Sequence, residues 1–398
     1  MIQSVKIRNY KSIRELGLEL GRVNVIIGEN GCGKTNILEA IVYASAASKN
    51  VLSQDYLGRQ LRLVAPEFMT PAFADMEDDS IENKTISITI QGENQLPKAM
   101  KAVYDAQERE WFTYNGEADD YFAVSAIQQI YKENKSVLKD FSESQKNEAL
   151  IDALERYDVP KVKELAPDIV REVKKALLDY PDLKSFAIYT PEESKLRLFT
   201  DEAYTYPLGR RGEGLFQYLK EIHVGEKQHI VDTIIEKMSL FDWFDGASIP
   251  DNLMSNEYRL KIGDKYLKES LHYFDQRSTN EGFLFLLFYM TLFASPDTPT
   301  FFAIDNIESS FNPKLCTKLI RTIVELAKQN NKQVILTTHS PYVLDGLDLS
   351  DEEQRLFVAK RNRDGHTQIK RIPFVDNLNM HLSEVWMKGM IGGLPDNF

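Results

Sequence analysis

The first ten residues of the chain alternate between polar and apolar side chains, which is typical of a β-strand with one buried face. Residues 23–27 form an almost uninterrupted apolar run, as expected for a strand inside a parallel sheet. Glycines follow this run, and apolar positions then recur at helical spacing over residues 35–47. The pattern therefore predicts a strand, a glycine loop and a helix in that order.

The middle of the chain has a different pattern. Alternation over residues 86–90 predicts a strand within an antiparallel group that extends from about residue 85 to residue 115. Charged residues at helical spacing then predict a helical insertion over residues 119–184. No heptad pattern continues far enough for a long coiled coil.

Strand patterns return at residues 185–189, and residues 258–267 are typical of a β-hairpin. A chain of 398 residues is longer than one core usually supports, so we expect two lobes. We predict one α/β unit formed by residues 1–118 and 185–398, with residues 119–184 inserted into it.

The glycine loop at residues 28–35 matches the phosphate-loop pattern G-x-x-x-x-G-K-[ST] in full. Glycines allow successive backbone N–H groups to face phosphates, Lys34 neutralises the β and γ oxygens, and Thr35 offers its hydroxyl to Mg²⁺. The sequence therefore predicts ATP and Mg²⁺ as ligands. The expected contacts with the nucleotide are Asn30, Gly31, Cys32, Gly33, Lys34, Thr35 and Asn36.

Two later strands end in polar residues. The apolar residues 300–304 lead into Asp305, and residues 333–338 lead into His339. Alone, an Asp in this place is more often a turn residue and a His more often a packing group. Beside a phosphate loop, Asp305 is expected to hold Mg²⁺ and His339 to contact the γ-phosphate.

The net charge of the chain limits how it could bind nucleic acid. The chain has 48 basic and 60 acidic side chains, a net charge of −12, so any contact with nucleic acid requires a local basic patch. Arginines at 210 and 211 are one candidate patch, and a second comprises Arg361, Arg363, Lys370 and Arg371. Either group can equally be a set of solvated surface charges.

The chain has two cysteines, too few for a disulfide framework, which favours a reducing cytoplasm. The N-terminus lacks the apolar core of a signal peptide. The most apolar stretch, residues 283–294, is shorter than the roughly 20 residues that cross a bilayer. We expect this stretch to be a buried helix and expect no membrane partner.

Three motifs in this order, separated by a long insertion, resemble the ABC-type ATPase heads of the RecF and SMC class. Within this AAA class, the chain looks most like standalone ATPases related to the OLD proteins (overcoming lysogenization defect). The resemblance implies an α/β fold in which a mixed sheet with flanking helices is joined to an antiparallel β-subdomain. It is carried by residues 28–35, 301–313 and 337–341, supported by residues 7–13 and 209–215, and does not cover residues 119–183.

The resemblance also implies a homodimer in which ATP is held between two heads. The phosphate loop of one head then faces a signature sequence of the other, which normally has a Ser two positions before a Gly. The best candidate places Asn280 before Gly282, so that asparagine replaces the serine. Alternatively, Asn280 is only the N-cap of the apolar helix.

Relatives usually have a glutamate directly after the aspartate at the strand end, whereas this chain has Asn306. An amide can orient the attacking water but cannot take its proton, and loss of a general base costs about 10²–10⁴ in rate. Slow hydrolysis is expected unless Glu308 substitutes, and Glu308 can also be an ordinary loop carboxylate. Residues 311–313, where relatives have Leu-His-Pro, are a weak candidate contact to the second head.

The leading hypothesis is an ATP-dependent dimeric switch that controls a separately encoded protein effector in phage defence. One alternative is a RecF-like repair ATPase that binds DNA, and another is a protein that binds ATP with almost no turnover. About 57 residues follow Pro341, too few for the TOPRIM nuclease domain of OLD proteins, so any nuclease is expected on another chain.

Overall fold

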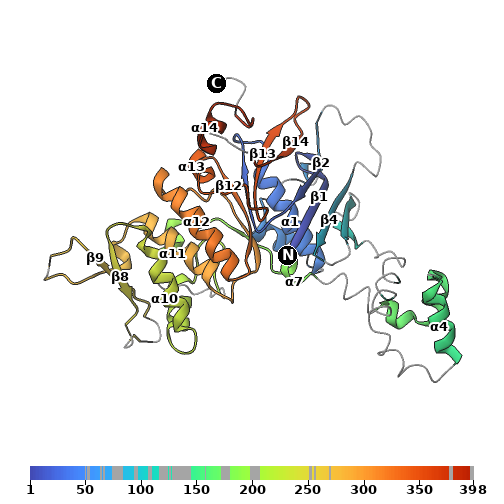
Figure 1. Cartoon of the computed structure of the whole chain (residues 1–398), viewed down its shortest axis with the longest axis horizontal. Coiled ribbons are helices and arrows are strands. Elements are labelled where there is room, and N and C mark those ends of the chain that lie inside the picture. Colours follow the sequence, from blue (N-terminus) through green and yellow to red (C-terminus); the bar gives the residue numbers. More distant parts are fainter. Residues whose placement is uncertain are drawn as a thin grey trace.

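The computed structural model describes most of the 398 residues. The described residues are 1–49, 51, 54–62, 65, 68–73, 84–93, 97–105, 110–115, 124, 127, 145–156, 158–171, 180–197, 207–250, 253–254, 257–268, 270–375 and 380–394. Figure 1 shows a central mixed α/β body with a helical segment set apart at one side.

An antiparallel sheet of five strands has the order β2-β1-β4-β5-β6. The strands are β1 (Ile2–Tyr10), β2 (Ile13–Glu19), β4 (Thr85–Gly92), β5 (Lys98–Asp105) and β6 (Glu110–Asn115). The side chains of β4 alternate between buried and partly exposed, which explains the polar and apolar alternation in its sequence. This sheet is the predicted antiparallel β-subdomain.

A second sheet has six strands in the order β14-β13-β3-β12-β11-β7. All of its neighbouring pairs are parallel except β13 with β14. Strands β3, β11 and β12 are buried at every residue, so they read as continuous apolar runs. The strands are β3 (Val23–Ile27), β7 (Ile188–Tyr189), β11 (Phe301–Ile304), β12 (Gln333–Thr338), β13 (Gln354–Arg361) and β14 (Thr367–Ile372). The mixed sheet of the predicted ABC-type head is thus confirmed.

Helices cover both faces of the six-stranded sheet. Helix α1 (Lys34–Ser48) shares one core with the five-stranded sheet, whereas α11 (Glu281–Ala294) lies in the core on the opposite face. Residues 282–294 are all buried, which confirms that the most apolar stretch is a core helix. The same core includes α9 (Leu215–His223), α10 (Gln228–Lys237) and α12 (Pro313–Gln329), and Figure 1 shows α10 and α12 beside α11.

Shorter elements complete the described body. They are α2 (Gln54–Gln60), α8 (Glu193–Leu196), α13 (Pro341–Leu344), α14 (Leu382–Met387) and the 3₁₀ turns Met238–Leu240 and Gln276–Ser278. Within the described residues, every helix is too short or too polar to cross a membrane.

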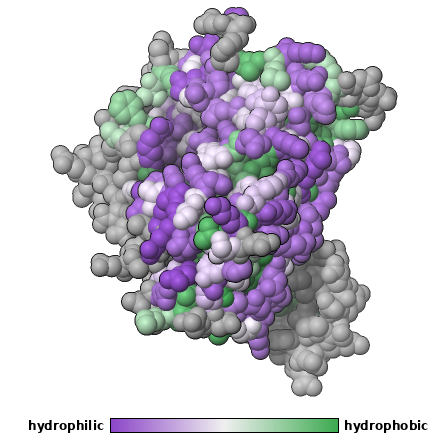
Figure 2. All heavy atoms as spheres, turned by 90° about the vertical axis from the view of Figure 1, so that its left-hand side faces the viewer, coloured by the Kyte–Doolittle hydropathy of each residue, from purple (hydrophilic) through white to green (hydrophobic). Residues whose placement is uncertain are grey.

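The prediction of a β-hairpin at residues 258–267 was wrong. A three-stranded sheet has the order β10-β9-β8, with β8 (Phe244–Ser248), β9 (Lys261–Asp264) and β10 (Phe274–Asp275). Gly263 and Asp264 continue strand β9, because β9 pairs with a strand on each side and these pairs outweigh the local turn signal. The face of the molecule that includes this sheet is mostly hydrophilic, with hydrophobic residues in small separate groups (Figure 2).

The segment predicted as an insertion contains α4 (Gln145–Glu155) and α5 (Val159–Leu165), which pack around a small apolar cluster of their own. Helix α7 (Pro181–Lys184) instead packs against α1 in the main body. Most of the helical pattern near residues 126–130 lies outside the described residues. The limits 119 and 184 stay a prediction.

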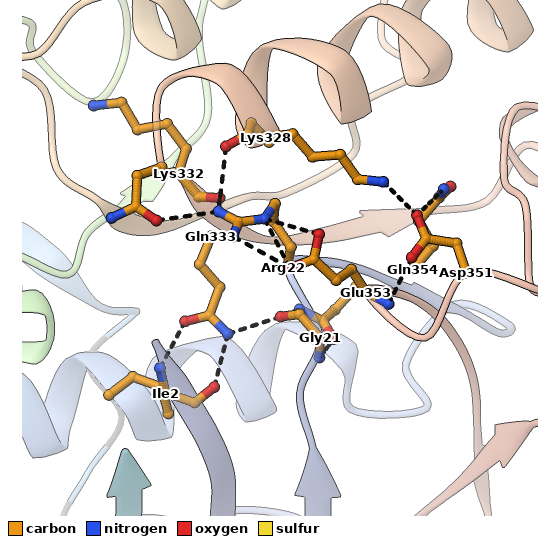
Figure 3. A network of polar contacts seen from close by, with 12 residues as sticks. Ile2, Gly21, Arg22, Lys328, Lys332, Gln333, Asp351, Glu353 and Gln354 are labelled. Carbon is orange, nitrogen blue, oxygen red and sulfur yellow. Dashed lines mark hydrogen bonds and ion pairs between the residues drawn. The ribbon is translucent and has the colours of Figure 1, made fainter. Parts of the chain in front are cut away.

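A polar network joins the two sheets at the edge where the parallel strands begin (Figure 3). The buried side chain of Gln333 accepts a hydrogen bond from Ile2 N and donates to Ile2 O and Gly21 O. Next to it, Arg22 forms an ion pair with Glu353. Gln333, at the start of β12, therefore fixes the start of β1 from the neighbouring sheet.

Replacing Gln333 by leucine is expected to lower the free energy of unfolding by about 2–4 kcal/mol, because each buried backbone group left unpaired costs about 1–3 kcal/mol. Urea unfolding of the nucleotide-free protein measures the loss. Gln329→Leu, at an exposed position of α12, is the control and should change the stability by under about 0.5 kcal/mol. A loss below about 1 kcal/mol for Gln333→Leu would contradict this role of the side chain.

Candidate functional site

The phosphate loop connects the end of β3 to the start of α1, as predicted. At two positions of this loop, neighbouring atoms leave no room for a side chain, so glycine is required. A Cβ on Gly28 would lie 2.2 Å from Ala359 O of β13. Gly33 is the N-cap of α1 with a left-handed φ of 101°, and a Cβ there would lie 2.1 Å from Thr367 Oγ1. The loop is therefore held against strands β13 and β14.

Lys34 is buried and its Nζ lies within the phosphate loop. The ammonium donates to Gly28 O at 2.8 Å and to Glu29 O at 3.0 Å, and His339 Nδ1 lies 3.4 Å away. Burial lowers the pKa of Lys34, while nearby groups including Asp305 oppose this shift. The charge is thus concentrated at the start of α1, where a phosphate would also meet the helix N-terminus.

Asp305 follows β11 at the same edge of the sheet. Its Oδ2 accepts a hydrogen bond from Thr35 Oγ1 at 3.0 Å, and its Oδ1 accepts one from Thr337 Oγ1. Thr337 Oγ1 also accepts from Asn306 N at 3.0 Å. Parallel strands β11 and β12 end side by side, which brings Asp305 and Thr337 together. Thr337 had no predicted role, although its position at the end of the apolar run is visible in the sequence.

The oxygen atoms of Thr35 and Asp305 suit a magnesium ion. Mg²⁺ prefers hard oxygen ligands and is usually held by one or two carboxylates together with phosphates and waters. In the described part of the chain, no group of three or more His, Cys, Asp or Glu side chains forms an all-protein metal site. This donor set fits an ion that binds together with a nucleotide.

His339 and Glu308 lie beside these residues. Glu308 Oε1 accepts a hydrogen bond from His339 N at 2.7 Å, whereas Glu308 Oε2 is buried and has no hydrogen-bond partner among the described residues. Burial, and then the charge of Lys34, lowers the pKa of His339, so the imidazole is neutral at pH 7. Glu308 therefore fixes the backbone that carries His339.

Asn306 is exposed and has a left-handed φ of 57°. Asparagine adopts this conformation more readily than most residues do. The backbone at Asn306 is fixed by its bond to Thr337, so its amide side chain lies on the surface beside Asp305. The position at which the resemblance predicts a glutamate is thus exposed at the surface.

Asn280 and Gly282 lie at the start of α11. Asn280 Oδ1 accepts from Phe283 N at 2.9 Å and is the N-cap of the helix. Glu281 accepts a hydrogen bond from Ser310, and Gly282 lies close to Ser310 O, so this helix start adjoins the loop after Asp305. No described hydrogen bond joins Asn280 to residues 28–35 of its own chain. The N-cap interpretation is confirmed, and the predicted signature contact stays a prediction.

Asn36 is buried in the first turn of α1. Its Nδ2 donates to Ser12 Oγ at 2.7 Å, and Ser12 Oγ lies 2.6 Å from Thr367 Oγ1. Thr367 Oγ1 in turn donates to Cys32 O at 2.9 Å. Thr367 could not be predicted as part of the site, because β14 comes to lie beside the phosphate loop only in the folded chain. Contact between Asn36 and nucleotide stays a prediction.

The arginines at 210 and 211 make contacts within the chain. Arg210 Nη1 donates to Gln60 O at 2.7 Å, and Arg211 lies 3.6 Å from Glu192. Burial lowers the pKa of Arg210, followed by the effect of Arg211. In the second predicted group, Arg371 forms an ion pair with Glu352, and Arg361 donates to Gly31 O. Among the described residues, Arg363 and Lys370 have no ion pair, so they are the stronger candidates for an external anion.

Two family models match the chain. The model described as "AAA ATPase domain" matches residues 1–207, and the model described as "AAA domain, putative AbiEii toxin, Type IV TA system" matches residues 108–345. Each match covers more than half of the chain.

Individual proteins are also similar. An ATP/GTP phosphatase of Helicobacter pylori is 22% identical over 395 residues, covering 96% of this chain and 98% of that protein. The DNA replication and repair protein RecF of Clostridium tetani is 42% identical over 55 residues, which are 14% of this chain and 15% of RecF. The chain therefore aligns with only a small part of RecF.

Among solved structures, SMC heads have the same fold. An SMC head bound to the C-winged helix domain of ScpA has a TM-score of 0.53 at 13% identity, covering 94% of this chain and 98% of that one. The SMC head of Pyrococcus furiosus, bound to the C-terminal domain of ScpA, has a TM-score of 0.50 at 13% identity and covers 98% of both chains.

Proposed function

The chain belongs to the AAA ATPase domain family, and from this premise we propose that it is a slow, dimer-dependent ATPase switch. Mg-ATP closes two heads on each other, and hydrolysis opens them again. The observation that carries this proposal is the cluster of Lys34, Thr35 and Asp305 at one sheet edge, with Asn306 in place of a general base.

Each residue at this edge has a distinct role in the proposal. Lys34 leaves the carbonyls of Gly28 and Glu29 and moves to the β and γ oxygens of the nucleotide. Thr35 and Asp305 would offer their oxygens to the metal, and the N–H of the neutral His339 would donate a hydrogen bond to the γ-phosphate. Bound Mg-ATP supplies the electrophilic phosphorus and neutralises the charge that develops on its oxygens.

Slow turnover follows from the two groups nearest to the attacking water. Asn306 can orient a water molecule but cannot accept its proton. Glu308 has one oxygen committed to His339 N and the other buried, so it reaches a water only after the loop rearranges. The closed state therefore persists, and the protein acts as a latch or timer.

A second head completes the site in this proposal. Asn280 and Gly282 lie at the start of α11, where free N–H groups and the positive end of the helix dipole favour a negative charge. Because no described hydrogen bond joins Asn280 to the phosphate loop of its own chain, the γ-phosphate that they meet belongs to the partner head.

Mixing two inactive variants tests this arrangement. Lys34→Ala damages the phosphate loop, and Asn280→Asp retains the N-cap but sets a negative charge against the partner's γ-phosphate. Each variant alone is expected to release no phosphate above background. An equal mixture should regain roughly a quarter of the wild-type rate, because half of the dimers are mixed and each contains one intact site. A mixture that stays inactive would contradict a shared site, provided that both variants retain the wild-type melting temperature.

The output of the switch is proposed to be a separately encoded protein effector in phage defence. This part is supported by the family description, which prints "putative AbiEii toxin, Type IV TA system", and by the net charge of −12, which disfavours nucleic acid as the main partner. The short RecF likeness favours the alternative of a DNA-binding repair ATPase. Affinity purification from the native host with ATP and with EDTA distinguishes them. The effector proposal expects a protein that co-purifies with ATP only, and duplex DNA that co-purifies instead of a protein would support the alternative.

A further inference from the structure

A groove runs between the edges of the two sheets, beside the phosphate loop. It comprises two joined cavities of about 620 and 740 Å³, which share Lys360, Gln368, Gly392 and Gly393. Strands β2 and β14 form its walls and are joined at one end by Thr367, whose N–H donates to Ser12 O. Glu29 of the phosphate loop lines one of the cavities.

Positive charge dominates this groove. We call it the basic groove, defined by Lys360, Arg361, Arg363, Lys370 and Lys388, all of them exposed lining residues. The carboxylates that line it are Glu15, which already pairs with Arg8, and Glu29. Among the described residues, no carboxylate forms an ion pair with Lys360, Arg363 or Lys370. In a chain with a net charge of −12, this concentration of unpaired cations favours an anionic ligand.

Two of the cations are spaced along the groove. In the β13 and β14 ladder, Lys360 lies opposite Gln368 and Val358 lies opposite Lys370, so both lysines project from the same face. Two residues along a strand correspond to about 6.8 Å, which separates the two lysines along the groove. Arg361 pairs with Thr367 and projects from the other face, where it contacts the phosphate loop, and Arg363 lies in the turn that joins the two strands. Cations spaced in this way suit a ligand with repeated negative charges better than they suit a single anion.

The segment after α14 adds open backbone to the groove. Gly389, Gly392 and Gly393 line it with left-handed φ angles of 71°, 79° and 80°. The N–H of Gly389 donates to Trp386 O and that of Gly392 donates to Gly389 O, so these two amides are already paired within the chain. A Cβ at Gly389 or Gly392 would meet open space, so a phosphate has room to approach the lysines.

We propose that the basic groove binds a single strand of nucleic acid through its phosphates, without reading its bases. The proposal goes beyond the ATPase switch and does not require hydrolysis. Arg361 Nε donates to Gly31 O of the phosphate loop at 2.9 Å, and the Arg361 guanidinium lies 5.9 Å from the centre of the Phe73 ring. A phosphate that attracts Arg361 changes this contact, so the strand and ATP influence each other's affinity reciprocally.

Fluorescence anisotropy with labelled oligonucleotides of mixed sequence tests the proposal in the full chain. The probes are single-stranded DNA, single-stranded RNA and duplex DNA, each at several salt concentrations. In Lys360→Gln/Lys370→Gln, the slope of log K against log salt should be smaller by about 1.4 than in the wild type, because each lost contact with a single strand contributes about 0.7. At 0.1 M salt this difference corresponds to an affinity about 25-fold lower.

The control is Lys265→Gln/Lys268→Gln, which removes the same charge from exposed positions after β9, far from the groove (Figure 1). It should keep the wild-type affinity, and both double variants should keep the wild-type melting temperature and ATP affinity. The proposal is overturned if the wild type binds no oligonucleotide at low salt, if both double variants lose equal affinity, or if duplex binds more tightly than single strands. Displacement of the oligonucleotide by an equal concentration of poly-glutamate would also overturn it, in favour of an acidic protein segment.

Discussion

Lys34→Ala is expected to weaken Mg-ATP binding at least about 100-fold, because hydrogen bonds to a charged group are each worth about 1.5–3 kcal/mol and Lys34 can make several to the phosphates. The ammonium already lies inside the phosphate loop, where it donates to Gly28 O and Glu29 O. Burial further limits the ability of water or another cation to replace it. Titration calorimetry with ATP and Mg²⁺ measures the loss.

The control for this variant lies at the other end of the same helix. Lys49→Ala removes an exposed lysine whose Nζ bonds to Tyr56, and it should leave ATP affinity within about twofold of the wild type. Circular dichroism checks that both variants are folded. If Lys34→Ala binds ATP within about threefold of the wild type, the phosphate loop does not hold the β and γ oxygens in the proposed way.

The second large effect is expected at Asn306. A glutamate there restores a base beside Asp305 and should raise the rate of phosphate release by about 10²-fold or more. At the left-handed φ of 57°, replacing Asn306 by glutamate is expected to lower the free energy of unfolding by about 1 kcal/mol, because asparagine tolerates this backbone conformation better. Asn306→Gln has the length of glutamate and the same backbone cost but no base, so it is the matched control.

Steady-state phosphate release compares the two variants at saturating ATP. Equal rates for Asn306→Glu and Asn306→Gln would show that a missing base at this position does not limit turnover. Glu308→Gln completes the comparison, because its amide oxygen can still accept from His339 N while the carboxylate charge is lost. A drop of tenfold or more would assign a proton-accepting role to Glu308, and an unchanged rate would leave it as a positioning residue.

The phosphate loop was the part of the site that could be predicted most completely from the sequence. The phosphate loop is contiguous, and its glycines, Lys34 and Thr35 have fixed spacing, so no tertiary information was needed to locate them. The apolar runs before Asp305 and His339 indicated parallel strands, and the family fold was predicted from their order. The antiparallel subdomain followed from alternating side chains in β4.

Other contacts could not be derived in this way, because they join residues far apart along the chain. Thr337 bonds to Asp305, and Thr367 bonds to Cys32 O, through strand pairs that no local pattern specifies. The hairpin at residues 258–267 failed for the same reason, since β9 takes partners on both sides.

The phosphate loop, the strands that lead to Asp305 and His339, and the buried helix of residues 283–294 could all be predicted from the sequence, because local spacing and hydrophobicity encode them. By contrast, the contact by which Glu308 fixes His339 N and the outward, left-handed position of Asn306 are visible only in the folded chain. The same holds for the groove that Lys360 and Lys370 share beside the phosphate loop. These arrangements depend on strand order and register, which bring distant residues to one edge through packing of the whole sheet.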